Sequence, residues 1–233
     1  MPLSFLSDME SNRGMPSQTL SNQGLYELQS HKEERLNVLT HGLGFLLSLL
    51  GLGLLLTATK DQGPGVRMVC WLYGLSLVQL FGVSTFYHAC PSVQLKKKAR
   101  ILDHCAIYIL IAGSYTPFMA ITLNDWRGWA VLGAVWTLAI LGVRYKLTSD
   151  SPFGAGSLVL YLCMGWLILL VWQPLVASLT GWGLGWLVAG GVIYSLGVPF
   201  YAWTSLKYSH SIWHLFVLAG AACQYVSVLF YVL

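Results

Sequence analysis

Seven runs of apolar residues, each close in length to a membrane-spanning helix, dominate this chain. A helix needs about 20 consecutive apolar residues to cross the hydrocarbon core of a bilayer. Because that core offers no water to the backbone, each run must satisfy its own hydrogen bonds by forming a helix. The runs lie near residues 38–59, 68–89, 101–123, 128–143, 153–173, 182–203 and 211–232. The sequence therefore predicts an all-α fold, a polytopic bundle of seven transmembrane helices.

The composition supports a membrane protein over a soluble one. Hydrophobic residues make up 56% of the 233 residues and charged residues only 9%, a balance that soluble domains do not normally have. The net charge of +4 arises from basic residues in short connections, so it does not indicate a nucleic-acid partner. We predict a multi-pass protein of the cell (inner) membrane whose partners are membrane lipids.

Lysine and arginine residues fall mainly on one side of the predicted bundle. Ten of the 13 lie in the N-terminal segment and in the second, fourth and sixth connections, and three lie on the opposite side. Cytoplasmic loops carry the excess of basic residues in membrane proteins. The N-terminus is therefore predicted to be cytoplasmic and the C-terminus to be outside.

The first part of the chain differs in composition from the rest. Its first 30 residues are rich in Ser, Asn, Gln and Gly, and they contain no apolar core that follows a basic segment. A secretory signal peptide would have both features. We therefore predict a flexible cytoplasmic tail over residues 1–33 and a membrane domain over residues 34–233.

Two histidine motifs lie at the ends of apolar runs. Ser84-x-x-x-His88 ends the second run and His210-x-x-x-His214 begins the seventh. A spacing of four residues places both side chains of a pair on one face of a helix. With the predicted topology, these motifs and Asp103 reach the same depth near the cytoplasmic face. Ionisable groups inside a membrane usually mark a functional site.

Three imidazoles with a fourth position open to water are typical of catalytic zinc sites. In this interpretation His88, His210 and His214 bind the metal, Asp103 accepts a proton from water, and Ser84 either orients that water or stabilises developing charge. The alternative is that these histidines only hydrogen-bond their neighbours, since pairs at this spacing also arise by chance at helix ends. His31 and His104 are interpreted in this second way, as histidines that only hydrogen-bond their neighbours.

A second polar cluster begins the first run. Glu34, Asn37 and His41 share one helical face, with Thr40 beside them. They either support the metal ligands from behind or cap the helix and anchor it at the interface. In the third run, the polar stretch 112–117 ends in Pro117, which predicts a kink that shapes a cavity.

These motifs together resemble the haemolysin III family, within the progestin and adipoQ receptor (PAQR) superfamily. The resemblance runs from about Glu34 to the C-terminus and is carried by residues 34–41, 84–88, 102–104, 112–117 and 210–214. It implies a seven-helix membrane protein that holds zinc (Zn²⁺) by His88, His210 and His214. It also implies that Asp103 and Ser84 contact the water on the metal. Related seven-helix hydrolases, including alkaline ceramidases, share this constellation and hydrolyse lipid amides.

Three functions compete at this point. The first is a zinc-dependent hydrolase that acts on an amide or ester bond of a lipid-like substrate. The second is a non-catalytic, receptor-like or regulatory membrane protein in which the metal is structural. The third is cytolysis, which only the family name suggests, because the sequence shows neither a secretion signal nor an amphipathic segment that would insert late into a target membrane.

Overall fold

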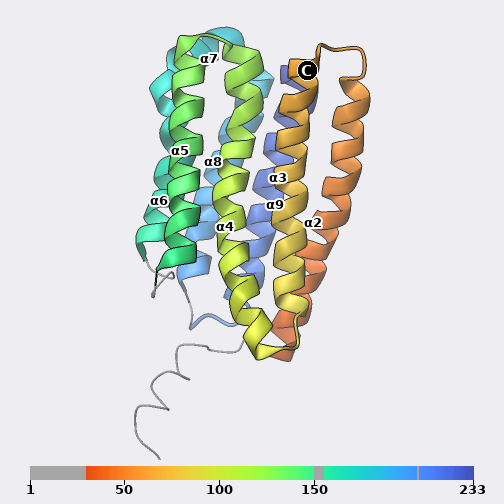
Figure 1. Cartoon of the computed structure of the whole chain (residues 1–233), viewed down its shortest axis with the longest axis vertical. Helices are drawn as coiled ribbons and strands as arrows, with labels where there is room; N and C mark the ends of the chain where they lie inside the picture. The colour runs from red at the N-terminus through yellow and green to blue at the C-terminus, as the bar shows by residue number, and fades with distance from the viewer. Residues whose placement is uncertain (1–29, 150–154, 204) are drawn as a thin grey trace, which may run out of the picture. The chain divides into compact units, whose positions relative to one another are not determined.

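The computed structural model describes residues 30–149, 155–203 and 205–233 (Figure 1). Within these residues the chain is helical, and seven segments are long and apolar enough to cross a membrane. This confirms the predicted all-α bundle of seven transmembrane helices. The orientation of the termini stays a prediction. The predicted tail, 1–33, lies outside the described residues as far as residue 29, and the first helix begins at His31.

The seven segments are built from the following elements. They are α2 (His31–Ala58), α3 (Pro64–Ala89), α4 (Val93–Pro117) with the π-helix η1 (Phe118–Leu123), α5 (Trp126–Thr148), α6 (Ala155–Trp166) with the 3-10 helix η2 (Leu167–Val171) and α7 (Trp172–Ser178), α8 (Gly181–Ala202), and α9 (Ser209–Ser227) with the π-helix η3 (Val228–Val232).

Several helix boundaries differ from the prediction, and all of these helices extend beyond their apolar runs. The third segment begins at Val93 and not near residue 101, so its cluster of lysines lies on a helix and not in a connection. Hydropathy locates only the apolar part of a helix, and here the helix extends beyond it. The fifth run also ends too early in the prediction, near residue 173, whereas α7 continues to Ser178.

Polar residues at the starts of three helices cap them. In each case the side-chain oxygen accepts a hydrogen bond from the backbone N–H three residues later, which satisfies a group that the helix itself leaves unpaired. The capping residues are Ser92, Asp125 and Thr180. At Asp125 the hydrogen bond from the Gly128 N–H, together with Arg127, lowers the pKa of this partly exposed carboxyl.

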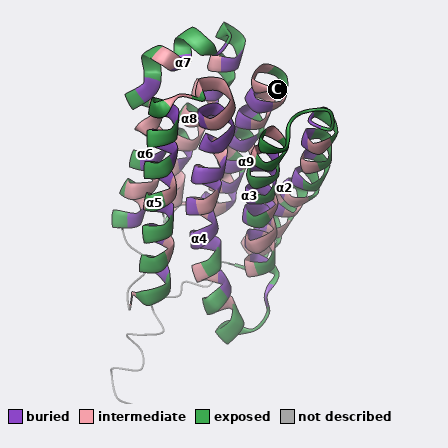
Figure 2. Ribbon diagram, turned by 45° about the horizontal axis from the view of Figure 1, so that its top comes forward, coloured by how far each residue is buried: buried purple, intermediate pink, exposed green. Residues whose placement is uncertain are grey.

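Helix α4 is the most enclosed element of the bundle. Buried residues account for 56% of its most apolar stretch but for only 28% of that of α2, and Figure 2 shows them along the length of α4. Leucines on the outer face of α2, such as Leu39, Leu46 and Leu50, are exposed. In a membrane this face contacts lipid chains, so its exposure carries no penalty.

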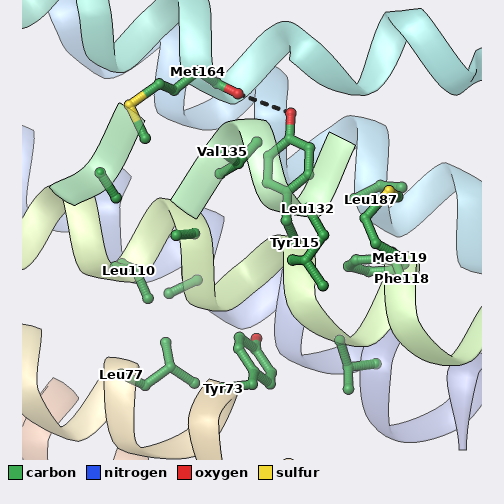
Figure 3. Packing of buried hydrophobic residues seen from close by; sticks show 14 of the residues in the cluster. Tyr73, Leu77, Leu110, Tyr115, Phe118, Met119, Leu132, Val135, Met164 and Leu187 are labelled. Atoms are coloured by element: carbon green, nitrogen blue, oxygen red, sulfur yellow. Dashed lines mark hydrogen bonds between the residues drawn. The ribbon is translucent and has the colours of Figure 1, made fainter. Parts of the chain in front are cut away.

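Tyr115 joins α4 to the irregular part of the fifth segment (Figure 3). Its hydroxyl donates its single proton to the carbonyl of Met164 or of Gly165, both at 2.9 Å, and accepts a 2.8 Å hydrogen bond from the Ile168 N–H. These are backbone groups at the point where α6 changes into η2. The tyrosine of the 112–117 stretch therefore stabilises a helix break. Pro117 ends α4 and the π-helix η1 begins after it.

Candidate metal centre

Three histidines from two helices converge at one end of the bundle. His88 lies near the end of α3, and His210 and His214 lie in the first two turns of α9. One nitrogen of each ring lies within 4.8 Å of the others, and the ring centroids are 4.6 to 5.1 Å apart. This is the group of described side chains whose spacing fits a metal ion.

Two of the three rings carry a buried nitrogen without a hydrogen-bond partner in the described part of the chain. These atoms are Nε2 of His88 and Nε2 of His210. A buried polar atom left without a partner costs about 1–3 kcal/mol. A metal ion among the rings satisfies such atoms, because the neutral imidazole nitrogen is a common metal ligand. The donor set therefore fits a bound ion.

The tautomer of His88 is set by Glu34, one helix away. Glu34 Oε2 lies 2.7 Å from Nδ1 of His88, and a carboxylate only accepts hydrogen bonds. Nδ1 therefore carries the proton, and Nε2 presents its lone pair. Lys96 holds the carboxylate from the other side, with Nζ 2.9 Å from Glu34 Oε1. A carboxylate behind a metal-binding histidine is a common arrangement in metalloproteins.

Thr40 sets the tautomer of His214 in the same way. Its hydroxyl donates its single proton to a backbone carbonyl of α2, that of Leu36 at 2.9 Å or of Asn37 at 3.1 Å. Towards His214 Nδ1, at 3.3 Å, the hydroxyl therefore acts as an acceptor. Nδ1 of His214 carries the proton, so the lone pair lies on Nε2, as in His88.

The predicted polar face of α2 contacts the histidines directly. Asn37 is fully buried and accepts a 2.6 Å hydrogen bond from the Ser211 hydroxyl, while its amide nitrogen lies 3.4 Å from His88 Nδ1. His41 stacks on His214, with ring centroids 3.5 Å apart and an angle of 10° between the rings. Glu34, Asn37 and His41 thus surround the three histidines without being members of the convergent group.

Asp103 and Ser84 line the same cavity as His210 and His214. Both are buried, and their side chains interact with each other. Asp103 is not one of the side chains that lie within metal-binding distance of each other. The structure therefore places a carboxyl group and a hydroxyl group beside the candidate metal position, where they can contact a molecule in the cavity.

The cavity has a volume of about 160 Å³ and extends from the histidines into the bundle. Its lining is mostly apolar and comes chiefly from α3, α4, α6, α8 and α9. Along α4 it runs from Asp103 to beyond Tyr115, a rise of about 20 Å at 1.5 Å per residue. The site is therefore one polar end of a long apolar space.

Some residues near the site were not identified from the sequence. Lys96 was assigned to a basic connection, and Ser211 lies unnoticed inside the histidine motif. Lys146 was also assigned to a connection, but it is buried at the end of α5 with Nζ 3.5 Å from His104 Nδ1. Ser211 had a local signal, because it lies beside His210 in the first turn of α9. Lys96 and Lys146 had none, because their contacts join residues distant in sequence.

Seven membrane-spanning helices, with three histidines converging beside a buried carboxyl group at one end, define a polytopic membrane protein with a candidate metal centre. The chain belongs to the haemolysin III family, within the progestin and adipoQ receptor superfamily. Residues 29–225 match the family described as "Haemolysin-III related". Family membership and the seven helices make it a multi-pass protein of the inner, or cell, membrane.

Three relatives illustrate the similarity. "Hemolysin-3" of Bacillus cereus is 44% identical over 203 residues, which cover 87% of this chain and 93% of that protein. "Hemolysin-3 homolog" of Bacillus subtilis (strain 168) is 41% identical over 201 residues, with 86% and 94% covered. "Monocyte to macrophage differentiation factor" of Homo sapiens is 32% identical over 206 residues, with 84% and 83% covered.

Proposed function

We propose that this protein is a zinc-dependent membrane hydrolase that cleaves an amide or ester bond of a lipid. The observation that carries the proposal is the convergence of three histidines beside Asp103 and Ser84 at one end of an apolar cavity. Three neutral imidazoles suit zinc and leave a coordination position open. Such a site accepts several first-row ions, and we assign zinc because it is a Lewis acid without redox chemistry, which suits hydrolysis.

Each residue has a role in this chemistry. A zinc ion bound by His88, His210 and His214 would polarise the substrate carbonyl and lower the pKa of water. Asp103 accepts the proton of the water that attacks the carbonyl carbon. It then returns the proton to the nitrogen or oxygen of the leaving group as the bond breaks. Ser84 donates a hydrogen bond to the oxygen on which negative charge develops.

The cavity indicates the substrate class. The histidine end is polar, and the remainder is lined mostly by apolar and aromatic side chains such as Leu110, Phe118 and Leu187. An amphiphile with an acyl chain fits this division, with the chain in the apolar part and the carbonyl at the histidines. The products are a fatty acid and an amine or alcohol.

The test uses the purified full-length protein in detergent, with labelled ceramides and phospholipids as substrates. We expect turnover that is lost on zinc removal and restored by added zinc. Elemental analysis should find about one zinc per chain, and a His210→Ala, His214→Ala double variant should contain none. A stable, zinc-loaded protein that releases no fatty acid from any of these lipids would contradict the proposal.

A structural metal in a regulatory protein is the second candidate. The Glu34–His88, Thr40–His214 and Asn37–Ser211 contacts join α2 to α3 and α9 at this site, so a metal there would also stabilise the bundle. This candidate predicts that Asp103→Asn preserves the cellular phenotype while His210→Ala lowers the melting temperature. Leakage of dye from liposomes on addition of the purified protein would instead support the cytolysis that the Bacillus relatives' names suggest.

A further inference from the structure

The end of the cavity far from the histidines contains two unsatisfied polar atoms. They are the Tyr194 hydroxyl on α8 and Gln224 Oε1 on α9, both buried and both without a hydrogen-bond partner within the described ranges. Both residues line the cavity. Some other buried hydroxyls of the bundle are satisfied by the backbone, such as that of Ser227 at 2.8 Å from the Gly183 carbonyl, whereas that of Tyr73 is also unpaired among the described residues but does not line this cavity.

The orientation of the Gln224 amide is fixed by its surroundings. Its Nε2 donates a 3.1 Å hydrogen bond to the Leu187 carbonyl, and a carbonyl only accepts. The nitrogen therefore lies on that side, and Oε1 remains as an acceptor without a donor. Tyr194, in contrast, offers an O–H donor. The two side chains together present one unused donor and one unused acceptor to the cavity.

Glycines on the facing helix position both side chains. A Cβ atom at Gly220 on α9 would lie 2.9 Å from ring carbons of Tyr194, and one at Gly190 on α8 would lie 2.8 Å from Gln224 Nε2. Each side chain thus fills the space that a glycine leaves on the neighbouring helix. Tyr194 lies one turn after Gly190 on α8, and Gln224 lies one turn after Gly220 on α9. The two side chains therefore occupy adjacent levels of the α8–α9 interface.

Two unpaired polar groups are costly at this depth. No bulk water reaches the hydrocarbon region, so each costs free energy unless a bound molecule pairs with it. A hydroxyl is the smallest ligand group that pairs with both, because it accepts from Tyr194 and donates to Gln224. From His214 to Gln224 the rise along α9 is about 15 Å.

We propose that Tyr194 and Gln224 form a hydroxyl-binding subsite, which selects lipids whose acyl chain carries a hydroxyl group far from the carbonyl. The proposal rests on the proposed function in one respect, that the carbonyl end of the lipid lies at the histidines. The apolar lining between the two ends accommodates the intervening methylene groups. Lipids with plain chains bind as well, but they leave both polar groups unpaired.

The experiment measures binding and not turnover. Purified full-length protein is titrated with palmitic acid, and with isomers of it that carry one hydroxyl placed stepwise along the chain, in competition with a fluorescent fatty acid. We expect at least one isomer with a hydroxyl in the far half of the chain to bind about tenfold more tightly than palmitic acid. An isomer hydroxylated next to the carboxyl group should show no such gain.

Two variants test the assignment. Tyr194→Phe removes only the hydroxyl, and Gln224→Met removes the amide with little change in volume. Each should reduce the tenfold preference to less than about threefold and leave the affinity for palmitic acid unchanged. Tyr225→Phe is the matched control, since the Tyr225 hydroxyl donates to the Gly51 carbonyl at 2.8 Å and does not line the cavity. It should retain the full preference.

Two results would overturn the subsite. One is a wild-type protein that binds all isomers like palmitic acid, which is expected if the polar atoms bind only water. The other is a preference that survives in both Tyr194→Phe and Gln224→Met. Because the readout is binding, a protein that prefers hydroxylated chains but hydrolyses no lipid would contradict the proposed function alone. Turnover without preference would contradict the subsite alone.

Discussion

The two ends of the cavity differ in how the hydrogen bonds of their polar groups are satisfied. At the histidine end, the nitrogens of His88 and His214 that face away from the candidate metal position are held by Glu34 and Thr40. At the far end, Gln224 is held on one side by a backbone carbonyl, but its oxygen and the Tyr194 hydroxyl are unpaired. The first end is preorganised around lone pairs, and the second offers one donor and one acceptor.

This difference indicates which part of a ligand each end receives. The histidine end contains ionisable groups, with Glu34 and Lys96 paired behind the histidines and Asp103 in the cavity wall. The far end contains only neutral polar side chains. A cation and a reacting carbonyl suit the first, because the charges of Glu34 and Lys96 there are already paired. A neutral hydroxyl suits the second.

The largest expected effect is at Asp103. Asp103→Asn keeps the shape of the side chain but cannot accept the proton of water, so turnover should fall by about 10²–10⁴-fold. Zinc content and the binding of hydroxylated chains should not change. Asp125→Asn is the matched control, because this partly exposed carboxylate caps α5 and lies outside the cavity lining. If the Asp103→Asn protein loses its zinc as well, Asp103 is a metal ligand and not a proton acceptor.

The next effect concerns the carboxylate behind His88. Glu34→Gln weakens the acceptor that fixes the His88 tautomer and also ends the ion pair with Lys96, so the affinity for zinc should fall by about 10–100-fold. Competition with a chelator of known affinity measures this. Glu33→Gln removes a charge from the neighbouring position, where the carboxylate accepts from the Tyr208 N–H. An equal loss in both variants would argue that only net charge matters.

The bundle and its histidines follow from local sequence patterns. Seven apolar runs are enough to predict seven helices, because the bilayer fixes the length of each. The four-residue spacing predicts which side chains share a face, so the pairing of His210 with His214 was accessible. The approach of His88 to this pair followed from assigning the helix ends to one side of the bundle.

The contacts that complete the site have no such signal. Glu34 and Lys96 lie on different helices, and their pairing depends on how α2 and α4 pack. The sequence places Lys146 in a connection, because it follows the end of the apolar run. Its charge does not show that α5 continues to Thr148. The unpaired atoms of Tyr194 and Gln224 are also invisible in the sequence, since being unpaired depends on every neighbour in three dimensions.

A smaller effect is expected where glycines shape the far end. Gly220→Ala places a methyl group 2.9 Å from the rigid ring of Tyr194, so the helices must separate or the ring must shift. Overpacking of this kind costs about 1–3 kcal/mol, and it should appear as a lower melting temperature of the purified protein. Gly133→Ala on α5 meets no atom within 4 Å among the described residues and should not lower it. A stable Gly220→Ala protein with unchanged chain selectivity would show that this interface is loosely packed.

The smallest effect is expected at Thr40, the neutral counterpart of Glu34. Thr40→Val keeps the volume of the side chain but removes the acceptor for the His214 Nδ1–H, a neutral hydrogen bond worth about 1 kcal/mol. Zinc affinity should therefore fall by about fivefold, less than in Glu34→Gln, and Thr40→Ser should restore it. Thr57→Val makes the same change on the same helix, where the hydroxyl bonds only to the Gly53 carbonyl, and should leave zinc affinity unchanged. If Thr40→Val matched Glu34→Gln, the two histidines would depend equally on their partners, and the charge of Glu34 would add nothing to the hydrogen bond it accepts.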